Sequence, residues 1–158
     1  MHEHEQEPSV PPAFAEARRR RADLHHALVD VERAISGPAL GREAAWAAEV
    51  SVRLKELLHT IDEHVEAAER PLGLYDEITA RAPRLSGQIE RLKAEHPLLR
   101  ETTRALIAKL EATPIGEAWS LGEARDEVQR LLGRIVRHRQ LGADLVWEAY
   151  NLDIGGIE

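Results

Sequence analysis

Apolar residues recur every three or four positions along four stretches of this chain, which is the spacing of one face of an α-helix. The first stretch predicts a helix over 13–36, which the Gly37-Pro38 pair ends. The second predicts a helix that starts at 42–46 and is kinked or ended at Pro71. Residues 72–81 keep the helical spacing, so we expect them to prolong this second helix beyond the kink.

The second half of the chain predicts two further helices. One runs over 83–111, and a kink is expected at Pro97 inside it because proline removes a backbone hydrogen bond. The other runs from a capping box, formed by Ser120 and Glu123, to about residue 151. Four amphipathic helices with short connections predict an all-α fold, an antiparallel up-down four-helix bundle that buries their apolar faces.

Three histidines stand where the apolar stripe predicts a hydrophobic side chain. They are His64, His96 and His138, and each belongs to a different predicted helix. A bundle that buries several imidazoles must hydrogen-bond them or use them to hold a ligand. Because the chain has no cysteine, a transition-metal site would consist of imidazoles and carboxylates.

The three histidines are also predicted to lie at comparable depth in the bundle. His96 and His138 stand at nearly equal distances along the chain from the turn between their helices, so the two are level. Counted from the turn near Ala82, His64 lies roughly 6 Å from the level of His96. Histidines from separate helices at one depth favour a metal site over isolated core histidines.

Further candidate ligands surround this group. His25 lies at the edge of the stripe on the first helix, and Glu69 returns to the border of the stripe on the second. His59 and Glu63 have the His-x-x-x-Glu spacing that places two ligands on one helix face. Both point away from the leucine stripe, which favours a solvated pair at that position.

Composition and charge narrow the class of protein. With 158 residues, 43% of them hydrophobic and 4% aromatic, the chain fits one helical domain over 13–152. Residues 1–12 read as a flexible acidic tail, in which His2 and His4 offer only loose metal contacts, and 153–158 as a second tail. The net charge of −7 argues against nucleic-acid binding, and the basic run 18–21 reads as a solvated helix face.

The same sequence contains no membrane signal. No run of about 18 apolar residues is present, and the N-terminal stretch is acidic and polar, unlike a signal peptide. We therefore expect no membrane association and a cytoplasmic location.

The histidine motifs resemble those of the hemerythrin-like family, also described as HHE cation-binding domains. The matching stretches are Asp23–Leu28, His64–Glu69 before Gly73-Leu74-Tyr75, Glu95–Leu99, and His138 followed by Leu145–Tyr150. The resemblance implies a four-helix bundle that holds non-haem iron, commonly as a di-iron pair. It also implies that the protein binds or senses O₂ or NO, or handles iron.

Three positions depart from the family pattern. Ala68 stands in place of a glutamate one turn after His64, Arg100 in place of a second histidine, and Gly142 in place of a carboxylate. A complete seven-ligand di-iron set is therefore absent. The remaining set suits one ion well and two poorly: His25, His64, Glu69, His96 and His138. Iron is implied by the resemblance, and zinc suits the same ligands.

Two other functions stay open at this point. An incomplete ligand set leaves coordination positions for substrate and O₂, as in a metal-dependent oxidative enzyme. Alternatively, the chain is a metal-free helical interaction protein. No catalytic residue is assigned, since the serines fall in predicted loops and caps and no glycine-rich phosphate loop is present.

Overall fold

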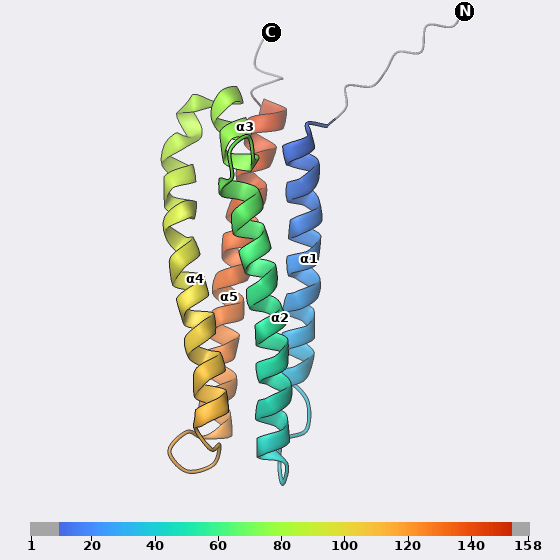
Figure 1. Ribbon diagram of the computed structural model, residues 1–158, viewed down its shortest axis with the longest axis vertical. Coiled ribbons are helices and arrows are strands. Elements are labelled where there is room, and N and C mark those ends of the chain that lie inside the picture. Colours follow the sequence, from blue (N-terminus) through green and yellow to red (C-terminus); the bar gives the residue numbers. More distant parts are fainter. Residues whose placement is uncertain (1–9, 153–158) are drawn as a thin grey trace, which may run out of the picture.

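The structure is a computed structural model that describes residues 10–152, and it is all-helical, with no strand in that range (Figure 1). Its four long helices are α1 (Pro12–Ile35), α2 (Glu43–Glu69), α4 (Ser86–Ala112) and α5 (Leu121–Trp147). Their bounds lie close to those predicted from the apolar spacing. The predicted tail residues 1–9 and 153–158, with His2 and His4, fall outside the described range.

Residues 72–81 form a separate helix and do not prolong α2. Helix α2 ends at Glu69, and Arg70 is extended, which is the conformation that a following proline favours. Leu72 then adopts a left-handed backbone with φ of 59°, and α3 (Leu74–Arg81) begins after Gly73. The expectation of a kinked continuation is therefore wrong, because the turn over 70–73 redirects the chain.

Short elements complete the two ends of the long helices. A 3₁₀ turn, η1 (Pro83–Leu85), precedes α4, so the α-helix begins at Ser86 and not at Pro83. Helix α4 runs through Pro97 as one helix. The predicted capping box of Ser120 and Glu123 is present at the start of α5, and the chain leaves α5 through a π-helical turn, η2 (Glu148–Leu152).

The core consists of two apolar clusters. The larger cluster includes Val65 of α2, Leu99 of α4 and Ile135 of α5. The smaller cluster lies around α3 and contains the next apolar positions along the same helices: Ala68, Leu92 and Leu145. Helices α2, α4 and α5 thus contribute to both clusters. On α4 and α5 the histidine lies between the two contributions, and on α2 His64 lies directly before Val65, where the larger cluster ends.

The connections place α3 and the candidate histidines in the same half of the molecule. The α1–α2 and α4–α5 loops lie at one end, and α3 lies at the other, near the first residues of α1 and the last of α5 (Figure 1). No helix among the described residues is both long and apolar enough to cross a membrane.

Candidate metal centre

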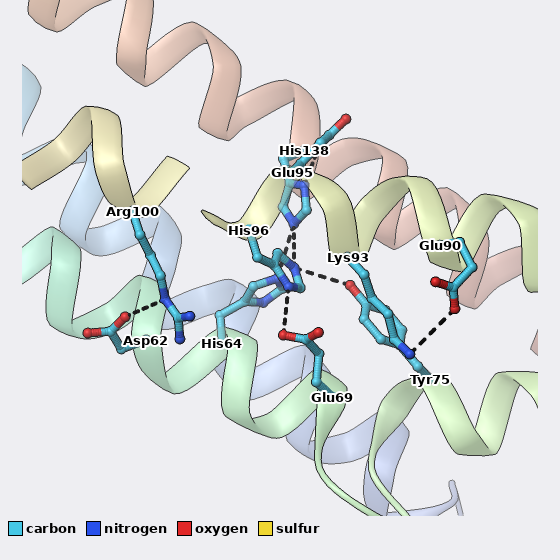
Figure 2. A network of polar contacts seen from close by, with 10 residues as sticks. All are labelled: Asp62, His64, Glu69, Tyr75, Glu90, Lys93, Glu95, His96, Arg100 and His138. Atoms are coloured by element: carbon cyan, nitrogen blue, oxygen red, sulfur yellow. Dashed lines mark hydrogen bonds and ion pairs between the residues drawn. The ribbon is translucent and has the colours of Figure 1, made fainter. Parts of the chain in front are cut away.

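Three imidazoles from three helices converge on one point (Figure 2). The Nε2 atom of His138 lies 3.4 Å from Nε2 of His64 and 3.2 Å from Nε2 of His96. One ligand atom from each histidine lies within 4.8 Å of the other two. The structure therefore brings together the three histidines that interrupt the apolar stripes.

The group lies inside the bundle. His96 and His138 are 1% and 3% exposed, and His64 is partly buried. Each side chain points inward because it occupies a core position of its helix, in register with leucine and isoleucine neighbours one turn away. Helical spacing, together with equal depth, is what places the imidazoles side by side.

Two carboxylates contact the other nitrogen of the buried histidines. Oε2 of Glu69, the last residue of α2, lies 3.2 Å from Nδ1 of His96, and Oε2 of Glu95 lies 2.6 Å from Nδ1 of His138. Each carboxylate accepts the Nδ1 hydrogen, which leaves Nε2 without one. His96 and His138 therefore both present an Nε2 lone pair to the centre of the group.

Tyr75 of α3 adds a hydroxyl to the same point. Its oxygen lies 3.3 Å from Nε2 of His96, and the two rings stack with centroids 6.0 Å apart. Burial raises the pKa of the phenol, and the negative charges of Glu69 and Glu95 raise it further. The hydroxyl therefore keeps its hydrogen and donates it to His96.

Sequence reasoning assigned no role to Tyr75. Its place depends on the turn over 70–73, which the apolar spacing did not reveal. Glu95 was named as the start of the stretch Glu95–Leu99, and in the structure its carboxylate contacts His138. Its signal in the sequence was its position next to His96, which directs it toward a neighbouring helix.

Two of the three imidazoles, those of His64 and His96, are held in their neutral form. Burial lowers the pKa of His64 from 6.5 to about 4, and the repulsion that a protonated His138 would exert is the next cause of this shift. Burial lowers the pKa of His96 to about 3, with the same kind of repulsion from His138 and His64 as the next causes. A neutral imidazole is the form that binds a metal, so the two side chains need no deprotonation at neutral pH.

The spacing of the nitrogens fits one metal ion. Two imidazole nitrogens held at about 2.1 Å by one ion lie about 3.0 Å apart at a right angle and about 3.4 Å apart at the tetrahedral angle. The two Nε2–Nε2 distances, 3.2 and 3.4 Å, fall within this range. The donor set and its carboxylate partners also match the arrangement in which a second residue orients each metal-binding histidine.

The other candidate ligands lie outside this group. His25 is exposed, and its Nδ1 lies 2.9 Å from Nη1 of Arg139, because the core position on α1 belongs to the neighbouring Leu24. His59 and Glu63 form a surface pair 2.5 Å apart. Glu69 is close to the group but contacts it through Nδ1 of His96, on the side away from the other imidazoles.

The three departures from the family pattern have distinct surroundings. Ala68 is buried in the smaller apolar cluster. The Arg100 guanidinium pairs with Asp62 at 2.8 Å, and it faces the histidine group as a positive charge that helps to lower the pKa of His96. Gly142 lines a cavity. Among the described residues, no second ligand group stands beside the three histidines.

That cavity opens directly beside the histidines. It has a volume of about 230 Å³, and His64, His138 and Tyr75 form part of its wall. Most of the remaining wall is apolar and comes from α1, α3 and α5. A small molecule entering it reaches two of the three imidazoles without passing through the packed core.

No protein-family model, curated protein or solved structure matches this chain. The class of protein is thus defined by the fold and the site: an all-helical bundle with three converging histidines.

Proposed function

We propose that this chain is a hemerythrin-like metal-binding protein, an antiparallel up-down four-helix bundle that holds one ion through His64, His96 and His138. The alternation of the loops between the two ends of the molecule supports the bundle topology (Figure 1). Support for the site comes from the convergence of three imidazoles, two of which, His96 and His138, have an Nδ1 atom oriented by a carboxylate.

One observation carries the proposal. Nε2 of His96 and Nε2 of His138 lie 3.2 Å apart, and the carboxylates take the hydrogen from the other nitrogen of each ring. In the metal-free chain the Tyr75 hydroxyl offsets part of the repulsion between these two lone pairs by donating to His96, and a cation lying against both nitrogens would offset all of it. A metal ion removes this repulsion and completes the bonding of both rings.

Iron is the ion we favour, through the resemblance to the hemerythrin-like family, and zinc suits the same three nitrogens. Three protein ligands leave coordination positions open, and ferrous iron bound there would supply affinity for O₂ or NO. The chain contributes a largely apolar wall, an entry cavity beside His64 and His138, and the Tyr75 hydroxyl as a hydrogen-bond donor. Binding or sensing of a diatomic ligand is therefore the function we propose.

Metal titration tests the site. The full chain, stripped with a chelator, is titrated anaerobically with Fe(II) and separately with Zn(II), and we expect one ion per chain. His96→Ala and His138→Ala should each weaken binding at least about tenfold. His25→Ala and His59→Ala, which change exposed histidines, should bind as the unchanged chain does.

Two results would overturn this proposal. The first is less than about 0.2 ion per chain after iron loading, which is the level of trace contamination. The second is equal metal affinity in His96→Ala and in the unchanged chain. If metal binds, mixing the ferrous protein with NO should produce a visible-region absorption band that His96→Ala lacks, and absence of the band would reject the gas-binding role alone.

An oxidative enzyme using the same site is the second candidate. The observation that favours it is the cavity of about 230 Å³, which is larger than a diatomic ligand requires. This function predicts oxygen consumption by the iron-loaded chain that depends on an added organic substrate. Uptake of O₂ that is independent of any such compound supports the first proposal instead.

The metal-free alternative and the metal-binding proposal predict different effects of His96→Leu on stability. If the histidines serve only as core residues, His96→Leu replaces a buried polar ring with an apolar side chain, and the melting temperature should rise with or without metal. If they hold a metal, His96→Leu should remove the stabilisation that added metal gives the unchanged chain. Thermal melts with chelator and with Zn(II) separate the two.

A further inference from the structure

The cavity beside His64 and His138 has an apolar floor. Phe14, Leu24 and Leu74 line it, and all three are buried. No carboxylate lines the cavity among the described residues. The floor therefore suits an uncharged, apolar group and offers no partner for a cation.

The rim of the cavity is positively charged. Arg18 and Arg21 of α1 are exposed residues that line the cavity, and Arg139 of α5 joins them from the opposite helix. The same three arginines also line an adjoining open depression, which again contains no carboxylate among the described residues. Three guanidinium groups thus border one entrance in a chain whose net charge is −7.

The arginine run on α1 divides between two roles. Arg20 pairs with Glu63 at 2.7 Å, as expected for a solvated helix face. Within the described residues, Arg18 and Arg21 make no hydrogen bond or ion pair, while Arg139 contacts only the ring of His25. Their guanidinium groups are therefore available to an anion, which arginine binds well through its fork of N–H donors.

We propose that this cavity binds a small organic monocarboxylate, with its apolar body on the floor and its carboxylate against Arg18, Arg21 and Arg139. The inference goes beyond the proposed metal function and does not require a metal. It rests on the combination of an apolar wall and, at its entrance, two arginines, Arg18 and Arg21, that make no ion pair among the described residues.

The volume sets the size of the ligand. At about 30 Å³ for each water displaced, a cavity of about 230 Å³ holds a compound of on the order of ten non-hydrogen atoms. This is below the ~300–1,000 Å³ typical of sites for drug-sized ligands. Phenylacetate has this size, and its ring and carboxylate match the floor and the rim.

Gly142 makes room for such a ligand. It lines the cavity, and a Cβ built at this position meets no atom within 4 Å. A larger side chain there would start in open space and extend into the cavity. Leucine has a higher helix propensity than glycine. Gly142→Leu should therefore block the cavity while the bundle stays folded.

Isothermal titration of the full, chelator-treated chain tests the proposal. We expect phenylacetate to bind at one per chain and 2-phenylethanol, which carries the same ring without the charge, to bind at least about tenfold more weakly. The double variant Arg18→Gln, Arg21→Gln should lose about tenfold in phenylacetate affinity. Gly142→Leu should abolish binding without lowering the melting temperature.

Arg19→Gln is the matched control, because Arg19 belongs to the same run but lines neither the cavity nor the depression. It should bind phenylacetate as the unchanged chain does. Equal affinity for the acid and the alcohol would overturn the proposal in favour of a neutral apolar ligand. Equal losses in Arg19→Gln and the double variant, no binding at all, or binding that Gly142→Leu leaves intact would also overturn it. Since no metal is present, none of these results bears on the metal site.

Discussion

Oε2 of Glu95 on α4 lies 2.6 Å from Nδ1 of His138 on α5, while the next residue of α4, His96, turns toward Glu69 of α2. Consecutive helical residues differ by about 100° in direction, so this pair of neighbours reaches two different helices. The result is a crossed arrangement in which each buried histidine has a carboxylate from another helix (Figure 2).

Removal of the Glu95 charge should weaken metal binding. Glu95→Gln keeps the size of the side chain but loses the carboxylate that orients His138, and such changes typically cost about 10–100-fold in metal affinity. Competition titrations with a chromogenic chelator measure the change. Glu90→Gln, on the exposed face of the same helix, is the control and should have no effect. Unchanged affinity in Glu95→Gln would remove Glu95 from the site.

Loss of the Tyr75 hydroxyl should act in the opposite direction. In the metal-free chain the hydroxyl donates to Nε2 of His96 at 3.3 Å, and a bound ion takes that lone pair instead. Tyr75→Phe therefore removes about 1 kcal/mol of hydrogen-bond stabilisation from the metal-free state and none from the metal-bound state. It should tighten metal binding about fivefold. The same titrations measure it. A tenfold loss of affinity would instead identify Tyr75 as a ligand.

The metal-free protein should lose stability as the pH falls from about 6.5 toward 4. The pKa values of His64 and His96, lowered to about 4 and about 3 from 6.5, mean that the unfolded chain binds more protons in this interval. The free energy of unfolding then falls by up to about 1.4 kcal/mol per pH unit for each histidine. Above pH 6.5 these groups add no slope.

Urea denaturation in the presence of a chelator checks this dependence. His96→Gln should flatten the slope, while His26→Gln, which changes an exposed histidine, should leave it unchanged. A slope of the same size in His96→Gln would show that other groups cause it.

The turn between α2 and α3 should respond in opposite ways to changes at adjacent positions. Leu72 has φ of 59° and is 88% exposed, so Leu72→Gly relieves backbone strain without loss of packing and should be neutral or stabilising by up to about 1 kcal/mol. Gly73→Ala places a Cβ 2.5 Å from the Ala67 carbonyl oxygen and should destabilise by about 1–3 kcal/mol.

Chemical denaturation measures both changes at the turn. Leu72→Ala keeps the strain and serves as the control for Leu72→Gly. Because this turn places Tyr75 beside His96, Gly73→Ala should also change metal affinity. If Gly73→Ala were as stable as the unchanged chain, this result would contradict the close approach of residue 73 to the Ala67 carbonyl oxygen.

Sequence periodicity was sufficient for the four long helices and for the inward direction of the three histidines, but not for the separate helix α3. A histidine inside a leucine stripe must point into the core, and equal distance from a shared turn sets equal depth, as for His96 and His138. On α1 the same reasoning was weaker, because His25 lies about 100° from Leu24 and only one of the two neighbours can face inward. Leu24 does so, being 1% exposed.

What the sequence did not reveal depends on contacts between segments distant along the chain. The role of Tyr75 follows from the turn at Leu72 and Gly73, and that of the rim arginines follows from the approach of α1 to α5. The spacing of apolar residues along the chain indicates neither relationship. The depth of His64 was also counted from Ala82, although α2 ends at Glu69.

The position of His96 and His138 between two apolar clusters has a consequence for cooperativity. In the metal-free chain, polar side chains join the cluster around α3 to the larger cluster, and such a boundary lets one part open before the other. Amide hydrogens of α3 and the adjoining helix ends should then exchange faster than those near Leu54 and Ile135. An ion bound by α2, α4 and α5 would crosslink the halves and make their exchange rates converge.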